Sequence, residues 1–466
     1  RIKGVRKWPW PHIRDEVGGK REDGTMALTS EKAAPQVNGS LGKDGSGTDA
    51  EFPTPYLGRS VRIVGQVVNV DMSQSPHPKN QRGELGKPLF NWYHNTVSKD
   101  PLTRVSAPNH FADRRHFLST VINQATRGTI NTRRVEVSDA AVMTRHIKAV
   151  AHYMGADVVA VAKAHPSFLY AGGRYVQDGS AQDDYESKMP EDLARQFPYI
   201  LVATTAWDYD KLQAHRHFIG DAAYHVSQIK GNMILKALEG YIKELGYTAL
   251  RGVAIPQAAG LASGVGELGR NGLLINKHFG ARIHMPDPIM TDLPLVPDEP
   301  VDIGVDDFCK ICRKCANTCP TNSITFDDKV VHNGVEKYKI NWLTCYKLRP
   351  YVHDHWSSCL TCAAVCPFTK PNVWWHDLAV WALRTCPYAA RPALVHALKW
   401  LDDRFWGVTR NSRVRWLDYD SGVKPGEHAC TVSGCTASHS GQEQGVVGEF
   451  GFYAPLKENT NRFVKR

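Results

Sequence analysis

Eight of the eleven cysteines lie between residues 309 and 366, in two closely spaced runs and one isolated position. The first run, residues 309–320, has the spacing C-x2-C-x2-C-x3-C-P. The second run, residues 359–367, ends in C-x2-C-x3-C-P, and Cys345 precedes it. Gaps of two residues let successive thiolates converge on one small cluster, so this pattern predicts two [4Fe–4S] clusters.

The fourth cysteine of such a run binds the other cluster in bacterial two-cluster ferredoxins. This crossed arrangement predicts one cluster on Cys309, Cys312, Cys315 and Cys366, and a second on Cys345, Cys359, Cys362 and Cys319. Zinc sites and disulfides are the alternatives for paired cysteines. Zinc sites rarely need a third cysteine at the same spacing and a fourth before proline, whereas the eight cysteines make two complete cluster sets. Two neighbouring clusters indicate a path for electrons.

The composition is that of an ordinary globular protein. The chain has 466 residues, 42% hydrophobic and 22% charged, and its length predicts two or three folded units. No apolar run reaches 18 residues, so we expect no transmembrane helix. The net charge of +10 favours an anionic membrane surface or an acidic partner. Because the basic residues are scattered, nucleic acid is not an expected partner.

Strand and helix patterns alternate from Val135 onward, which predicts an α+β core. Apolar runs at 157–161 and 199–203 indicate buried strands, residues 225–245 indicate a long helix, and another strand is expected within 61–70. We expect four parts: an N-terminal arm and wrapping segment (1–134), the α+β core (135–300), the two-cluster module (301–380) and a C-terminal helical and loop segment (381–466).

Residues 264–269 read Gly-Val-Gly-Glu-Leu-Gly, which satisfies the G-x-G-x-x-G pattern of dinucleotide-binding loops. That pattern requires a strand immediately before it, whereas residues 258–264 are small residues typical of a loop or helix. Asp287 stands at about the spacing of the required acidic residue, but between two prolines. We therefore expect close packing and a tight turn here, and no nicotinamide site.

Five segments between residues 138 and 380 match one known family in its own order: 155–161, 244–247, 269–275, 292–324 and 362–377. They resemble segments of corrinoid-dependent reductive dehalogenases. The related epoxyqueuosine reductases share the cluster module, but the Pro-Phe-Thr-Lys to Trp-His-Asp run that ends at Asp377 favours the dehalogenases.

This resemblance implies a nitroreductase-like α+β core that buries a base-off cobamide, with the ferredoxin-like two-[4Fe–4S] module inserted after it. Electrons would pass from the clusters to cobalt, which needs low-potential clusters nearby and a dry pocket. The resemblance also implies a set of cofactor-binding residues, namely Arg270, Asn271, Gly272, Lys370 and His376.

In this family a tyrosine donates a proton beside the halogen, supported by a basic residue and a loop asparagine. The tyrosine position falls here on Gln228, which is not a donor of that kind. Tyr224 lies one helical turn earlier on the same face, and the basic position falls on His284. We take Tyr224 and His284 as candidate catalytic residues; their non-catalytic interpretation is a helix-face aromatic and a surface-loop histidine. The loop of residues 256–270 contains no asparagine.

Three hypotheses follow. The chain is a reductive dehalogenase with a rearranged proton donor, a corrinoid reductase of the same fold with another substrate, or an electron-transfer subunit that has lost the corrinoid. The resemblance implies peripheral attachment to the outer face of the cytoplasmic membrane, with any export signal upstream of Arg1; the cytoplasm is the alternative. Expected partners are an electron-donor protein or quinol-linked complex and a small membrane anchor protein or acidic subunit, and an oligomer is compatible with the sequence.

Overall fold

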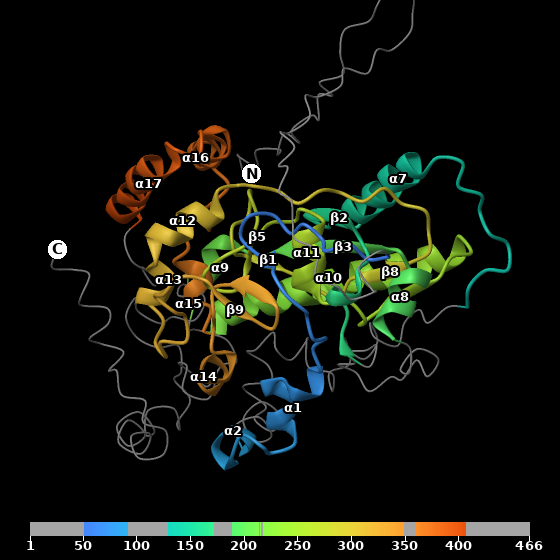
Figure 1. Cartoon of the computed structure of the whole chain (residues 1–466), viewed down its shortest axis with the longest axis horizontal. Helices are drawn as coiled ribbons and strands as arrows, with labels where there is room; N and C mark the ends of the chain where they lie inside the picture. Colours follow the sequence, from blue (N-terminus) through green and yellow to red (C-terminus); the bar gives the residue numbers. More distant parts are fainter. Residues whose placement is uncertain are drawn as a thin grey trace, which may run out of the picture. The chain divides into compact units, whose positions relative to one another are not determined.

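The computed structural model describes residues 51–91, 129–171, 189–213, 215, 218–348 and 359–406 (Figure 1). Most of the expected N-terminal arm and the end of the expected C-terminal segment lie outside these residues, so the limits of the four parts stay a prediction. The described residues form a mixed helix and sheet fold, as predicted.

The core sheet has the strand order β2–β3–β8–β4, and every neighbouring pair is antiparallel. The end of β3 also pairs with β7. The bounds are β2 (Val158–Lys163), β3 (Tyr199–Ala206), β4 (Ala249–Arg251), β7 (Ile283–His284) and β8 (Ile289–Thr291). Both strands expected at 157–161 and 199–203 are confirmed, and both end further along the chain than expected.

Both faces of this sheet are buried. Ile200 and Val202 of β3 pack on one face, with α11 (Pro256–Ala262). Leu201 and Ala203 pack on the other, with α7 (Ala140–Tyr153) and α10 (Phe218–Glu244). Successive side chains of a strand point to opposite faces. Covering both faces therefore requires the continuous apolar runs seen in the sequence.

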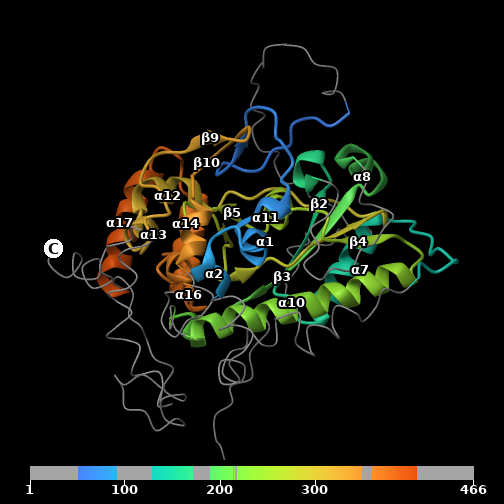
Figure 2. The same ribbon diagram turned by 90° about the horizontal axis from the view of Figure 1, so that it is seen from below.

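The long helix α10 lies along the sheet (Figure 2) and starts earlier than residue 225. It ends before Gly246, whose φ is +84°. A Cβ at Gly246 would lie 2.6 Å from Cα of Arg134, so this turn requires glycine. Among the described helices, none combines the length and apolar character needed to span a membrane.

The cysteine-rich module follows the core and is built from short helices and one hairpin. Its elements are α12 (Val305–Cys312), α13 (Lys314–Asn317), β9 (Val330–His332), β10 (Val335–Lys337), α14 (Trp342–Lys347) and α15 (Thr361–Ala364). Two helices follow it, α16 (Trp374–Thr385) and α17 (Arg391–Phe405), and α17 packs against α12 (Figure 1). Further short elements of the described residues are η1 (Met72–Gln74), α1 (Pro76–Gln81), α2 (Lys87–Asn91), η3 (Pro166–Phe168), α8 (Pro190–Gln196), α9 (Tyr209–Gln213), β5 (Glu267–Leu268) and β6 (Leu274–Ile275).

The strand expected within 61–70 is much shorter than predicted. Only β1 (Arg62–Ile63) is a strand, and it pairs antiparallel with β10 of the module. Beyond it, the backbone of Val68 exchanges two hydrogen bonds with the side-chain amide of Asn333, at 2.9 and 2.7 Å. A side chain thus replaces the backbone partner that a longer strand would need.

The glycine-rich loop at 264–269 follows helix α11 rather than a strand. A Cβ at Gly264 would lie 2.2 Å from the carbonyl oxygen of Glu299, and one at Gly266 would lie 2.4 Å from that of Ile275. The predicted role of these glycines in close packing is therefore confirmed.

Candidate iron–sulfur and catalytic site

The seven cysteines of the two runs and the isolated Cys345 lie close to one another, and the two sets predicted from the spacing are called the first and the second group. Burial raises the pKa of the Cys315 thiol, and Coulomb interactions with Cys309, Cys366, Cys362 and Cys312 raise it further. Burial likewise raises the pKa of the Cys362 thiol, and Coulomb interactions with Cys345, Cys359, Cys319 and Cys366 raise it further. The division of these cysteines between two clusters stays a prediction. Such pKa values disfavour free thiolates, and binding to a metal reverses this preference.

A cavity lies within the first group. All four of its cysteines line the cavity, together with apolar side chains such as Phe308 and Phe368. Backbone N–H groups point at the sulfur atoms, from Arg270 to Sγ of Cys309 at 3.4 Å and from Ser323 to Sγ of Cys319 at 3.3 Å. Converging thiols with N–H donors to sulfur fit a [4Fe–4S] cluster, whose potential depends on such hydrogen bonds.

Arg270 connects the core to the cysteine-rich module through hydrogen bonds. Its side chain is 1% exposed and donates three hydrogen bonds to backbone oxygens: Nε to Cys309 at 3.0 Å, and Nη1 to Thr325 at 2.9 Å and Asp327 at 2.7 Å. The guanidinium also lies 4.0 Å from the ring centroid of Tyr338. Arg270 is therefore engaged by the segments around the first cysteine run.

The next two predicted cofactor-binding residues are also packed against the module. Asn271 donates from Nδ2 to the carbonyl oxygen of Cys362 at 3.1 Å. Gly272 has φ +69°, and a Cβ there would lie 2.2 Å from Cδ1 of Ile340. The structure thus places Arg270, Asn271 and Gly272 beside the cysteine groups.

Lys370 and His376 follow the second cysteine run, and both are buried. Lys370 forms an ion pair with Asp402 at 2.6 Å. Burial, with the nearby charge of Lys370, lowers the pKa of His376 to about 4, so its imidazole is neutral at physiological pH. Nε2 of His376 is buried and has no hydrogen-bond partner among the described residues.

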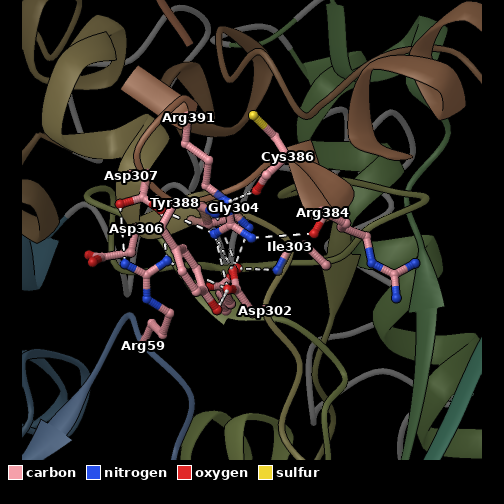
Figure 3. Close-up of polar contacts among 12 residues, drawn as sticks. Arg59, Asp302, Ile303, Gly304, Asp306, Asp307, Arg384, Cys386, Tyr388 and Arg391 are labelled. Carbon is pink, nitrogen blue, oxygen red and sulfur yellow. Dashed lines mark hydrogen bonds and ion pairs between the residues drawn. The ribbon is translucent and has the colours of Figure 1, made fainter. Parts of the chain in front are cut away.

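An ionic network fixes helix α12, which carries Cys309 and Cys312 (Figure 3). Arg391 of α17 donates to both carboxylate oxygens of Asp302 at 3.0 Å and to Asp307 at 3.1 Å. Arg59, from the N-terminal side, donates to Asp307 at 2.8 Å. Segments far apart in the sequence therefore hold the first cysteine run in place.

Glu267 supports the start of the same helix from inside the protein. Its carboxylate accepts from the backbone N–H groups of Ile303 at 2.7 Å and Val305 at 3.1 Å. Glu267 is 1% exposed, and burial raises its pKa to about 7 despite these bonds.

This raised pKa predicts a stability that falls with pH. Since the native state holds the proton more tightly than the unfolded chain, the stabilisation is complete below about pH 4.5 and is lost as the pH rises through about 7. The loss is about 3 kcal/mol, because one pKa unit corresponds to about 1.4 kcal/mol. We expect Glu267→Gln to remove this part of the pH slope in anaerobic unfolding between pH 5 and 8. The exposed Glu244→Gln should keep the wild-type slope, and an unchanged slope in Glu267→Gln would contradict the assignment.

The two candidate catalytic side chains lie together, although 60 residues separate them. The ring of Tyr224, on α10, lies edge-on to the imidazole of His284, on β7, with centroids 5.4 Å apart. Trp207 makes a similar edge contact with Tyr224 at 5.3 Å. Ser227 fixes this part of α10, since its hydroxyl and carbonyl groups bond to Thr205 at the end of β3.

The surface-loop interpretation of His284 is wrong. His284 is 8% exposed and belongs to β7, which pairs with β3. Burial, then the charge of His225, lowers the pKa of His284 to about 3, so its imidazole is neutral at physiological pH. Oε1 of Gln228 accepts a hydrogen bond from Nδ1 of His225 at 3.1 Å. A neutral His284 does not act on Tyr224 as a cationic neighbour would.

Comparison with known proteins also indicates an iron–sulfur module and a similarity to reductive dehalogenases. The family described as a 4Fe-4S dicluster domain matches residues 308–370. The tetrachloroethene reductive dehalogenase of Sulfurospirillum multivorans is 28% identical over 318 residues, covering 62% of this chain and 61% of that protein. A solved catabolic reductive dehalogenase in complex with 3-bromo-4-hydroxybenzoic acid is 25% identical, with a TM-score of 0.62, covering 75% of this chain and 48% of that one. The resemblance to reductive dehalogenases is confirmed.

A shorter match joins the chain to epoxyqueuosine reductases, as expected. That of Lactococcus garvieae is 26% identical over 155 residues, covering 32% of this chain and 43% of that protein. The chain spans less than two thirds of the length of these relatives. It is thus a reductive dehalogenase-like chain with a 4Fe-4S dicluster domain.

Two further buried residues lie beside Tyr224 and His284, and the sequence did not single them out. Trp207 and Arg282 are 3% and 7% exposed. Nη1 of Arg282 donates to the carbonyl oxygen of Trp207 at 2.6 Å, and the Trp207 N–H donates to that of Arg282 at 2.7 Å. The only signal for Arg282 was its position two residues before His284, at strand spacing.

Proposed function

We propose that the chain is a corrinoid-dependent reductase that passes electrons through two [4Fe–4S] clusters to a cobamide, for reductive cleavage of a carbon–halogen bond. The contact of Tyr224 with His284 is the observation that carries this proposal, because the resemblance requires a proton donor near these positions. The two cysteine groups supply the electron path.

Unsatisfied polar atoms are compatible with a bound cobamide. Nε1 of Trp207, Nε of Arg282 and Nε2 of His376 are buried without a hydrogen-bond partner within the described part of the chain. A buried polar atom without a partner costs about 1–3 kcal/mol, and the amide and phosphate groups of a cobamide or a polar substrate would satisfy such atoms. When bound, a reduced cobamide supplies a strongly reducing, nucleophilic cobalt centre.

The protein's own residues take distinct roles in this proposal. Tyr224 donates the proton that the substrate carbon needs after the halogen leaves. Neutral His284 and Trp207 hold the tyrosine ring from two sides and exclude water. Arg270, Asn271 and Gly272 keep the clusters close to the core, while Lys370 and His376 bound the cofactor region from the segment after Cys366.

The finer architecture and the cellular context also follow from the resemblance. We propose that the core is nitroreductase-like and that the protein attaches peripherally to the outer face of the cytoplasmic membrane. A small membrane anchor protein or acidic subunit and an electron-donor protein or quinol-linked complex would be its partners. The net charge of +10 supports attachment to an acidic surface.

Metal content tests the proposal directly. We expect anaerobically purified protein to hold about eight irons, as two [4Fe–4S] clusters require, and about one cobalt per chain. Elemental analysis and the visible spectrum would measure both. Irons without cobalt, even after incubation with cobamide under reducing conditions, would contradict the corrinoid and leave an electron-transfer subunit.

A second candidate is a reductase of the same fold that acts on a non-halogenated substrate. Gln228 at the position of the family tyrosine favours it. Cobalt and iron in the expected amounts, with substrate reduction but no halide release from any organohalide, would support this candidate over a dehalogenase.

A further inference from the structure

A buried cluster of charges lies beside the first cysteine group. Its members are Lys314 (4% exposed), Lys370 (7%) and Asp402 (7%). Lys314 stands between Cys312 and Cys315 in the sequence, and Lys370 follows Cys366 by four residues. Both ammonium groups therefore belong to segments that carry ligands of the first cluster.

Asp402, on α17, joins the two lysines. One of its carboxylate oxygens pairs with Nζ of Lys370 at 2.6 Å, and the other pairs with Nζ of Lys314. Asp403 also lies 2.8 Å from Lys314, but it is 38% exposed and shares its charge with Lys399. Asp402 is thus the one acidic side chain of this cluster that is fully buried among the described residues.

These charges act in a poorly screened environment. Lys370 lies 4.9 Å from the ring centroid of Trp406, so an aromatic side chain also covers it. Buried charges interact far more strongly than exposed ones, and salt screens them less. The reduction potential of an iron–sulfur cluster depends on nearby charge, because reduction adds one negative charge to the cluster.

We propose that Asp402 and Lys370 form a charge pair that sets the reduction potential of the cluster held by the first cysteine group. Asp402 disfavours the reduced cluster and keeps its potential low, whereas Lys370 favours the reduced cluster. Neither residue acts on a substrate. The proposal rests on the dicluster domain and not on the cobamide, so it stands or falls independently of the proposed reaction.

Redox titration of the anaerobic, cluster-loaded protein, followed by electron paramagnetic resonance, tests this proposal. We expect Asp402→Asn to shift the midpoint potential of the first cluster upward and Lys370→Met to shift it downward. The second cluster, assigned through a Cys345→Ser variant, should shift less in both. Asp403→Asn is the matched control, and it should give a smaller shift because its carboxylate is partly exposed.

The two substitutions should shift the midpoint potential in opposite directions, which distinguishes an effect of charge from structural damage. Shifts of the same sign, equal shifts at both clusters, or no shift would overturn the proposal. Removing Asp402 leaves two buried lysines, so Asp402→Asn protein could fail to hold iron. Two variants cover this outcome. The double variant Asp402→Asn/Lys370→Met should return toward the wild-type potential, and Asp402→Glu should keep it; a large shift in Asp402→Glu would contradict a role of charge.

Discussion

Replacing Tyr224 by phenylalanine should lower reductive turnover by about 10²–10⁴-fold, the range typical for loss of a general acid. The substitution removes the hydroxyl and keeps the ring that packs edge-on against Trp207 and His284. Both clusters and the fold should therefore remain. Halide release from a panel of organohalides, driven by a chemical reductant, measures the turnover, and iron and cobalt contents show that the cofactors are retained.

The same helix offers a matched control. Tyr241 also lies on α10, and its hydroxyl bonds to Nε2 of His146 at 2.6 Å, on the α7 side of the sheet. Tyr241→Phe removes the same atom from the same helix and should leave turnover unchanged. If Tyr224→Phe protein turns over at the wild-type rate, another group donates the proton and the catalytic assignment of Tyr224 is wrong.

The second large effect concerns Arg270, where we expect a methionine to destabilise the protein by about 3 kcal/mol or more, because each buried carbonyl oxygen left without its donor costs about 1–3 kcal/mol. The guanidinium is buried, and its loss leaves the carbonyl oxygens of Cys309, Thr325 and Asp327 without this donor. The loss occurs where the first cysteine run meets the core. Anaerobic thermal unfolding should show a lower midpoint, and the iron content per chain should fall.

An exposed arginine provides the comparison. The side chain of Arg62 is 66% exposed, and it pairs with Glu336 at 2.7 Å. Such surface pairs contribute about 0–1 kcal/mol, so Arg62→Met should change the unfolding midpoint little. Equal effects of the two substitutions would show that Arg270 does not link the core and the module as the hydrogen bonds indicate.

The spacing of residues predicted the features that depend on neighbouring positions in the chain. The 4Fe-4S dicluster domain was predictable from cysteine gaps of two and three residues, and β2 and β3 were predictable from apolar runs that need burial on both faces. Features that depend on contacts between distant segments could not be predicted. His284 is buried because β7 pairs with β3, almost 80 residues earlier in the chain. No sequence pattern around His284 predicts this pairing.

The buried charges beside the first cluster could not be predicted from the sequence for the same reason. Lys314 and Asp402 are 88 residues apart, and each looks like an ordinary surface charge in its own segment. The strand expected within 61–70 was predicted too long. Apolar and polar residues do alternate there, but the partner strand β10 is only three residues long. A strand can extend no further than the backbone that pairs with it.

The small sheet β1–β10–β9 bears on the order in which the protein can fold. Arg62 of β1 and Glu336 of β10 are separated by 274 positions, so the outer strand leaves the ribosome long before its partner exists. Closing so long a loop has a high entropic cost, and contacts of this kind form late in folding. The hairpin of the cysteine module would otherwise expose β10 as an edge open to other chains. A nascent molecule should therefore carry β10 as an exposed edge until β1 pairs with it.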